Sequence, residues 1–203
     1  MKRWITSDWH LGEDRMAIMM RPFKTPEEML EVLVERHNAL VAPDDLVYVN
    51  GDVCYQKKPE ELSEVSCFNG HKILIRGNHD RVFTDEELLK WFDEVIPEGQ
   101  GVDLEVAGVP TYITHYPSQA RPDRFNLVGH IHGAWKLQLN MVNIGVDANH
   151  FTPHNLDEIV PFFLKAITEF YDDDVWAAYM QQNQQFVGQR GKKGVYFDPT
   201  GGK

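Results

Sequence analysis

Cysteine is scarce in this chain of 203 residues, which contains only Cys54 and Cys67. Two cysteines are too few for a disulfide framework, and we expect both to be reduced structural thiols. Long hydrophobic runs are also missing, since no apolar stretch approaches the roughly 18–20 residues of a membrane helix. The first ten residues, MKRWITSDWH, have neither the apolar core nor the cleavage site of a signal peptide. The sequence therefore predicts a cytoplasmic protein with no membrane partner.

Basic residues are outnumbered, with 20 lysines and arginines against 31 acidic residues and a net charge of −11. Nucleic-acid surfaces usually need a basic patch, so stable binding to nucleic acid is not expected. A nucleotide substrate remains compatible with this charge, because bound divalent cations would reverse the local field. The apolar fraction of 42% is ordinary for a globular domain with a full core.

The first half of the chain alternates strand and helix patterns, and the second half is mostly strand. Helices are expected over 25–41, 58–68 and 84–96, with Thr25 as an N-cap and with Thr84 and Glu87 at capping-box spacing. Strands are expected over 3–7, 44–52, 71–80, 102–115 (two strands about a turn), 125–129 and 139–147. This order predicts an α/β fold, with either one mixed sheet or two packed sheets and helices outside.

The last fifty residues have a different pattern. Asn155 and Glu158 could cap a helix, Pro161 could begin a new one, and 162–171 and 175–186 have helical patterns. The segment 187–203 is glycine-rich and locally basic, which indicates a flexible tail or a partner-binding arm. We therefore divide the chain into a domain over 1–155 and a C-terminal helical extension with a glycine-rich tail over 156–203.

Carboxylate, imidazole and amide side chains follow five of the expected strands. In chain order they are Asp8 and His10, Asp52, Asn78 with His79 and Asp80, His115, and His130 with His132. Ligand sites in α/β sheets gather at the carboxyl ends of the strands. No cysteine belongs to the set, so its oxygen and nitrogen donors suit Mn²⁺, Fe, Zn²⁺ or Mg²⁺ rather than a thiolate zinc site.

The spacing within these motifs suggests how they could chelate. Asp8 and His10 are two residues apart, as are His130 and His132, so each pair would point the same way if its strand continued. The residues between them, Trp9 and Ile131, would then face packing. Spacing alone leaves three arrangements open for the histidine pair: one shared metal, two different metals, or none. A carboxylate could bridge two ions about 3.5–4 Å apart, which can hold a hydroxide and neutralise a phosphate.

Each motif alone is most often a turn, a helix cap or a solvated surface. Five such motifs in order, each after an expected strand, are hard to attribute to chance. We assign the remaining histidines to ordinary packing or surface roles; they are His37, His71, His150 and His154.

Together these residues resemble the calcineurin-like metallophosphoesterases. The family pattern is Asp-X-His, Gly-Asp, Gly-Asn-His-(Asp/Glu), His and Gly-His-X-His, which here reads SDWH, NGDVC, RGNHD, THYP and VGHIH. RPF at 21–23 and NIGVD at 143–147 look like a compact bacterial and phage branch of the family. The resemblance implies a catalytic domain over 1–155 with two packed mixed β-sheets flanked by helices, an α/β/β/α sandwich. It also implies the cytosol of a bacterium or of a phage-infected host.

The resemblance further implies a role for each motif residue. Three residues would hold the first of two divalent metal ions: Asp8, His10 and His132. Three would hold the second: Asn78, His115 and His130. Asp52 would bridge the two ions, with Mn²⁺ the first choice and Fe, Ni²⁺, Zn²⁺ or Mg²⁺ as alternatives. His79 would point at the substrate and help to protonate the leaving oxygen, while Asp80 would orient and charge His79. A metal-bridging hydroxide would attack phosphorus in line, so no protein nucleophile is needed.

One position departs from the resemblance, because close relatives often have histidine where this chain has Glu13. The basic residues nearest the motifs are expected to be solvated surface groups; they are Arg15, Arg21, Arg81 and Arg121. The expected activity is hydrolysis of a small phosphodiester, including nucleotides, with phosphomonoesters as a further substrate class. A nuclease or nucleic-acid phosphatase is one alternative, and a non-catalytic interaction scaffold is another. The C-terminal helices could also form a homodimer.

Overall fold

The structure is a computed structural model that describes residues 1–55 and 58–168 of the chain. The helix expected over 175–186 and the glycine-rich tail lie outside these residues. Part of the helical pattern over 162–171 also lies beyond them. The remaining expectations can be compared with the structure directly.

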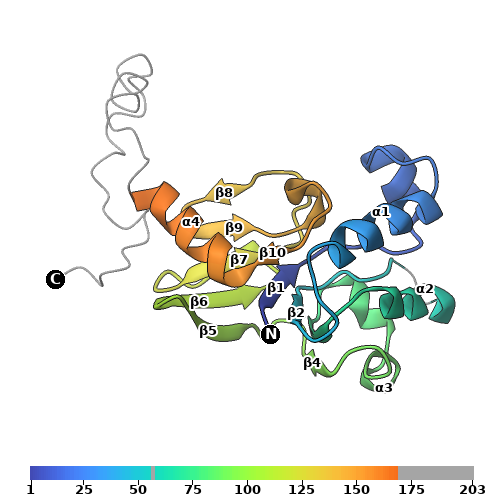
Figure 1. Cartoon of the computed structure of the whole chain (residues 1–203), viewed down its shortest axis with the longest axis horizontal. Coiled ribbons are helices and arrows are strands. Elements are labelled where there is room, and N and C mark those ends of the chain that lie inside the picture. The colour runs from blue at the N-terminus through green and yellow to red at the C-terminus, as the bar shows by residue number, and fades with distance from the viewer. Residues whose placement is uncertain (56–57, 169–203) are drawn as a thin grey trace, which may run out of the picture.

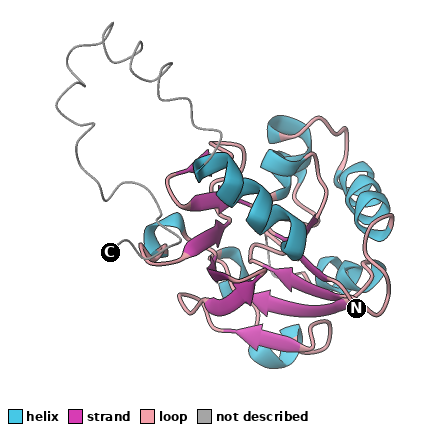
Figure 2. Ribbon diagram, turned by 60° about the vertical axis from the view of Figure 1, so that its left-hand side comes forward, coloured by secondary structure: helices cyan, strands magenta, loops and turns pink. Residues whose placement is uncertain are grey.

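Two five-stranded sheets form the centre of the molecule, with helices around them (Figures 1 and 2). The first sheet has the order β10-β1-β2-β3-β4, in which β1 to β4 are parallel and β10 is antiparallel. Its strands are β1 (Arg3–Thr6), β2 (Leu46–Val49), β3 (His71–Ile75), β4 (Glu94–Ile96) and β10 (His154–Asn155). Both sheets are mixed, and the expected sandwich of two mixed sheets flanked by helices is confirmed.

The second sheet has the order β5-β6-β7-β9-β8, in which β6, β7 and β9 are parallel. Its strands are β5 (Val102–Val106), β6 (Val109–Thr114), β7 (Phe125–Val128), β8 (Leu137–Gln138) and β9 (Met141–Asn143). The hairpin of β5 and β6 turns at Ala107 and Gly108, as expected, and both residues have positive φ.

Strand alternation divides the buried side chains between two cores. In β1, Trp4 packs into a core with the helices, while the next residue, Ile5, packs into a core with the second sheet. The same division separates Val49 from Tyr48 in β2. Because successive side chains leave opposite faces of a strand, a central strand buried on both faces is apolar throughout. The first sheet is therefore buried on both faces up to the end where the polar motifs begin.

Three helices lie beside the first sheet: α1 (Pro26–Asn38), α2 (Pro59–Ser63) and α3 (Asp85–Leu88) (Figure 1). Thr25 caps α1 by accepting a hydrogen bond from the Glu28 amide at 3.2 Å, and Thr84 and Glu87 form the expected capping box. The expected helix over 84–96 is wrong beyond Leu88. The β-branched residues Val95 and Ile96 pair with β3 instead, because a half-buried pleated edge suits them better than a helix does.

Helix α4 (Leu156–Thr168) runs without interruption through Pro161, so the expectation of a new helix at that residue is wrong. Asn155 begins the helix as expected, because its side chain accepts a hydrogen bond from the Asp157 amide at 3.0 Å. Ile159 and Val160 pack into the core between the sheets, and this burial favours one continuous helix across the proline. His154, expected in a loop, belongs to β10.

Short helical turns complete the described chain. They are a π-helix, η1 (Met16–Met20), and the 3₁₀ helices η2 (Glu64–Cys67), η3 (His79–Val82), η4 (Pro117–Gln119) and η5 (Val146–Asn149). Within the described residues, no helix has the length and apolar character needed to cross a bilayer.

Candidate metal centre

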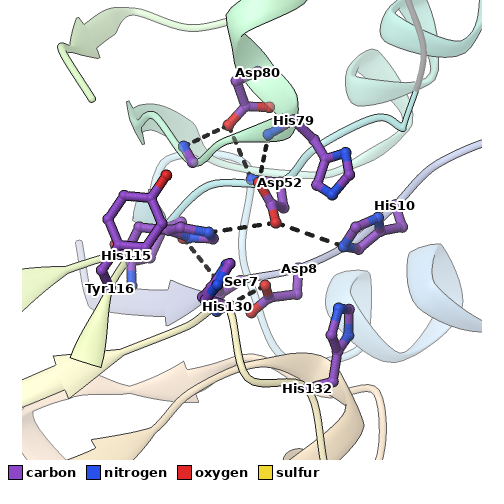
Figure 3. A network of polar contacts seen from close by, with 12 residues as sticks. Ser7, Asp8, His10, Asp52, His79, Asp80, His115, Tyr116, His130 and His132 are labelled. Atoms are coloured by element: carbon purple, nitrogen blue, oxygen red, sulfur yellow. Dashed lines mark hydrogen bonds and ion pairs between the residues drawn. The ribbon is translucent and has the colours of Figure 1, made fainter. Parts of the chain in front are cut away.

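The ends of strands from both sheets meet at one place (Figure 3). Asp8 and Asp52 follow β1 and β2 of the first sheet, while His115 and His130 follow β6 and β7 of the second. The parallel arrangement of β1, β2 and β3 brings their carboxyl ends to a common edge, as that of β6 and β7 does. The site thus forms where two sheet edges face each other.

The backbone leaves the strand conformation before it reaches these side chains. Positive φ angles occur at five of the expected ligands: Asp8 (62°), His10 (53°), Asp52 (56°), His130 (73°) and His132 (49°). Left-handed backbone is uncommon for residues other than glycine, and it clusters at functional sites. The assumption that the strands continue through the paired motifs is therefore wrong, and the pairs converge through loop geometry instead.

The residues between the paired ligands behave differently from each other. Trp9 is buried and stacks on Phe68 with ring centroids 4.2 Å apart, so its expected packing role is confirmed. Ile131 is only half-buried and lines a surface pocket, so its expected place in the core is wrong. The reason is that the 130–134 segment turns outward from β7 rather than extending it.

Two glycines allow the backbone to approach the ligands closely. A Cβ atom at Gly77 would lie 2.3 Å from Asp52 Oδ1, and one at Gly129 would lie 2.9 Å from Asp8 Oδ2. Distances under 3.0 Å leave no room for a side chain. The glycines of the RGNHD and VGHIH motifs are therefore required by packing around the carboxylates.

The predicted ligands lie in groups whose donor atoms are within 4.8 Å of one another. One group contains Asp8, His10 and His132, and another contains Asp52, His115 and His130. This places the two histidines of VGHIH in different groups, although a single residue separates them. A third group joins His79 to His10 and Asp52, so the geometry also permits His79 to act as a ligand.

Four buried polar atoms at this site have no hydrogen-bond partner. They are Asp8 Oδ2, His10 Nε2, Asn78 Oδ1 and His115 Nε2. Buried polar atoms are normally satisfied, because burying them unpaired costs free energy. All four belong to expected ligands, and all can donate an electron pair to a cation. The residues present therefore fit divalent metal ions.

Three of the histidines are oriented by an acceptor at Nδ1. His10 contacts Glu13 at 2.8 Å, His115 contacts the Asn50 carbonyl at 2.7 Å, and His132 contacts Asp147 at 2.9 Å. A hydrogen bond donated from Nδ1 leaves Nε2 with a free lone pair, which is the arrangement of metal-binding histidines. Glu13 and Asp147 were missed as orienting partners. Two features of the sequence could have indicated these partners. Glu13 lies three residues after His10, and Asp147 is the acidic last residue of NIGVD.

Asp52 lies between the two groups. Its Oδ1 accepts a hydrogen bond from the His79 amide at 3.0 Å. Its Oδ2 is 3.3 Å from His115 Nε2 and 3.7 Å from His10 Nε2 (Figure 3). Burial alone would raise the pKa of this carboxyl, but the nearby His115 and the His79 amide outweigh it and lower the pKa to about 2. Asp52 is therefore a carboxylate with one oxygen directed between the two halves of the site.

Asp80 contacts the backbone around the site. Its carboxylate accepts hydrogen bonds from the backbone amides of Asp52 at 2.9 Å, Val53 at 3.0 Å and Gly77 at 2.8 Å. Burial raises the pKa of Asp80 to about 6, although these three amides favour the charged form. Both oxygens accept from backbone amides, and in the described part of the chain the His79 ring makes no hydrogen bond to Asp80, so its expected orienting role stays a prediction. Asp80 joins the loops after β2 and β3 and so positions Asp52.

His79 begins η3 and is half-buried at the edge of the site. Its ring centroid lies 5.0 Å from that of His10 and 5.2 Å from that of Tyr55. The ring projects to the same side as His10 and away from His115 and His130 (Figure 3). It therefore borders the first group of ligands from outside.

Arg21 is not the solvated surface group that was expected. Its side chain is fully buried, pairs with both oxygens of Asp147 at 2.8 Å and donates to the carbonyl of Asp8 at 2.7 Å. Arg21 thus links the backbone of the first motif to the carboxylate that orients His132. Arg81 and Arg121 are exposed, as expected, and pair with Glu98 and Asp103 respectively.

Comparisons with known proteins agree with this geometry. An uncharacterized protein of Methanocaldococcus jannaschii is 27% identical over 179 residues, covering 81% of this chain and 92% of that protein. The gene 66 protein of Mycobacterium phage L5 is 30% identical over 80 residues, which are 38% of this chain and 39% of that protein. The crystal structure of a protein of unknown function from Aquifex aeolicus shares the fold, with a TM-score of 0.61 and 23% identity over 79% of this chain and 98% of that one. The family model for calcineurin-like phosphoesterases matches residues 1–162, and the chain belongs to that family.

Proposed function

We propose that this protein is a dinuclear metal-dependent phosphoesterase that hydrolyses phosphodiesters, with phosphomonoesters as a second substrate class. The observation that carries the proposal is the set of four unpartnered buried atoms on Asp8, His10, Asn78 and His115. Two of them, His10 Nε2 and His115 Nε2, face the same oxygen of Asp52, a carboxylate that lies between two groups of donors. The third such group in the described residues, His10 with Asp52 and His79, lies at the same place.

Each ligand has a proposed place. Asp8, His10 and His132 would hold one ion, Asn78, His115 and His130 would hold the other, and Asp52 would serve both. When bound, two divalent cations lower the pKa of a water between them and offset the negative charge of a phosphate. Mn²⁺ is the first candidate because the donors are oxygen and imidazole nitrogen with no thiolate. The free thiols of Cys54 and Cys67 fit a reducing cytoplasm.

The chain's own groups perform the remaining work. Glu13, Asp147 and the Asn50 carbonyl hold three imidazoles with Nε2 free, so little reorganisation is needed when ligands bind. Among the described residues, the His79 ring makes no hydrogen bond, and we assign it the protonation of the leaving oxygen. Its position beside His10 supports that role.

Two other functions are less well supported. A nuclease would need basic groups to follow a nucleic-acid backbone, but the net charge is −11 and Arg81 and Arg121 are each neutralised by an acidic partner. A non-catalytic scaffold would be expected to have lost ligands, whereas all seven ligand positions and His79 are filled here.

The test is a substrate panel on metal-stripped protein with Mn²⁺, Ni²⁺, Zn²⁺ or Mg²⁺ restored. It contains aryl phosphodiesters, aryl monoesters, 2′,3′-cyclic and 3′,5′-cyclic nucleotides, and single-stranded oligonucleotides at low salt. We expect metal-dependent hydrolysis that is faster on small diesters than on oligonucleotides. Faster hydrolysis of oligonucleotides would favour the nuclease instead, and no hydrolysis with any metal would contradict the proposal.

Variants separate catalysis from metal binding. His79→Ala is expected to retain both ions but to lose about 10²–10⁴-fold in kcat, the usual contribution of a general acid. Asp52→Asn is expected to weaken both ions. His71→Ala is the matched control, because this histidine is exposed and pairs only with Asp93 far from the site. If His79→Ala and His71→Ala had equal turnover, the role of His79 would be wrong.

A further inference from the structure

A pocket of about 480 Å³ adjoins the metal centre and has no role in the reaction described above. Its apolar walls come from Met20, Pro22, Ile131, Ala134 and Phe151. These residues come from the segment that contains η1 and from the two loops that follow β7 and η5. The pocket is therefore built from segments distant in the sequence and is lined mainly by hydrocarbon and thioether groups.

The charged residues of the pocket neutralise each other. Arg21 donates to both oxygens of Asp147 and to two backbone carbonyls, of Asp8 and Trp9. Asp147 also contacts His132 Nδ1 at 2.9 Å. Neither residue has a charge left for a ligand. A charged group would lose hydration in this pocket without gaining a counter-charge, so the pocket suits an uncharged group.

His132 connects the pocket to the metal centre. It lines the pocket, and it also belongs to the donor group with Asp8 and His10. A phosphoryl group held at that donor group therefore has the pocket beside it. His79 and His132 lie on either side of His10, with ring centroids 5.0 Å and 4.9 Å from it (Figure 3). The pocket is thus on the side away from the group assigned to the leaving oxygen.

The wall formed by η1 suits a flat ring. Met20 lines this wall and is 65% exposed, although methionine is usually buried. Thioether side chains adapt to irregular shapes and make favourable contacts with aromatic rings. The ring of Phe151 offers an aromatic contact on another wall-forming segment. The π-helical form of η1 is rare and is found frequently at functional sites.

We propose that this pocket binds a planar, uncharged aromatic substituent, an aryl group or a nucleobase, on the part of the phosphodiester that is retained after hydrolysis. The proposal rests on the proposed phosphoesterase function. It names the substrate class that the site would select.

The test varies the retained group and keeps the leaving group constant. Methyl, phenyl and thymidine 5′ esters of p-nitrophenyl phosphate all release p-nitrophenol, so release of the same product is compared in each case. We expect kcat/KM for the phenyl or the thymidine ester to exceed that for the methyl ester at least tenfold. Preference for phenyl alone would assign an aryl substrate, and preference for thymidine alone would assign a nucleobase. Equal kcat/KM for all three esters would overturn the proposal.

Substitutions at two adjacent methionines localise the effect. Met20→Glu puts a charge on the pocket wall and is expected to bring kcat/KM for the aromatic esters down to that for the methyl ester. Met19→Glu is the matched control, because Met19 is similarly exposed but is not among the residues that line the pocket. Met20→Leu should restore most of the preference. If Met19→Glu and Met20→Glu had the same effect, the pocket would not be the selecting site.

A binding measurement separates this proposal from the proposed function. Calorimetry on the Mn²⁺-loaded protein would compare phenylphosphonate with methylphosphonate, which share one anionic group. We expect phenylphosphonate to bind at least tenfold more tightly, and Met20→Glu to abolish the difference. If no ester were hydrolysed but this preference remained, the phosphoesterase proposal would fail and the pocket would stand. Hydrolysis of the esters with equal binding of both phosphonates would support the phosphoesterase proposal and overturn the pocket proposal.

Discussion

Glu13 contacts Nδ1 of His10 at 2.8 Å, and both side chains are buried. The carboxylate of Glu13 therefore orients one of the expected metal ligands. A carboxylate at Nδ1 fixes the tautomer that leaves Nε2 free and makes the imidazole a stronger donor.

Glu13→Ala should therefore weaken metal binding by about 10–100-fold, the usual cost of losing such a partner. Glu13→Gln keeps an oxygen that can accept the Nδ1 proton and should retain most of the affinity. Calorimetric titration with Mn²⁺ would measure both, with circular dichroism to verify the fold. Asp14→Ala is the control, since Asp14 is exposed and adjacent in sequence. Equal affinities for Glu13→Ala and Asp14→Ala would contradict the role of Glu13.

Arg21 and Asp147 form a buried ion pair whose loss should be costly. Arg21→Leu leaves the Asp147 carboxylate without its main counter-charge, and we expect the free energy of unfolding to fall by about 3–5 kcal/mol. Arg121→Leu removes an exposed ion pair with Asp103 and should cost far less, because exposed pairs contribute little to stability. Urea denaturation of metal-free protein gives both values. A similar fall in the free energy of unfolding in the two variants would show that the buried pair of Arg21 and Asp147 contributes no more than an exposed pair.

Tyr116 packs its ring edge against two ligands of the second group. Its ring centroid lies 4.9 Å from that of His115 and 5.0 Å from that of His130, and its hydroxyl donates to Glu98. Tyr116→Ala should weaken the second ion by roughly tenfold, as loss of supporting residues around a metal does, and spare the first. Tyr116→Phe keeps the ring and should bind both ions normally. Titration of the two sites with Mn²⁺ would test this, and equal weakening of both ions would contradict it.

His37 should make the stability of the protein sensitive to mild acid. Burial lowers the pKa of its imidazole from 6.5 to about 4, although the hydrogen bond of Nε2 to the Asn69 carbonyl opposes this shift. The unfolded chain therefore takes up a proton as the pH falls below 6.5, while the folded protein does so only near 4. Stability is lost through this window, by at most about 3 kcal/mol.

The His37 prediction is tested by urea denaturation of the wild type and of His37→Gln between pH 4 and 7, with chelator present. The wild type should lose more stability than the variant as the pH falls, because glutamine does not titrate. Parallel curves would show that His37 does not contribute to the acid sensitivity.

Most of the secondary structure was readable from the sequence because local signals agreed with the final fold. Thr25, Thr84 and Asn155 are caps in the structure, and apolar runs such as LVYV are strands. The errors occurred where tertiary packing overrode the local pattern. Val95 and Ile96 joined the edge of the first sheet, and Pro161 remained inside a helix held by the core between the sheets.

The identity of the polar residues at the strand ends was determined by the sequence alone, because five motifs in order specify donor types and their attachment to strands. Which of these residues share a donor group at the metal centre was decided by the tertiary structure. Left-handed backbone at His130 and His132 sends two residues of one motif to different donor groups, which strand alternation does not predict. The supporting contacts of Glu13, Arg21, Asp80 and Asp147 also depended on the fold, because hydrogen bonds between distant segments exist only once both sheets have packed.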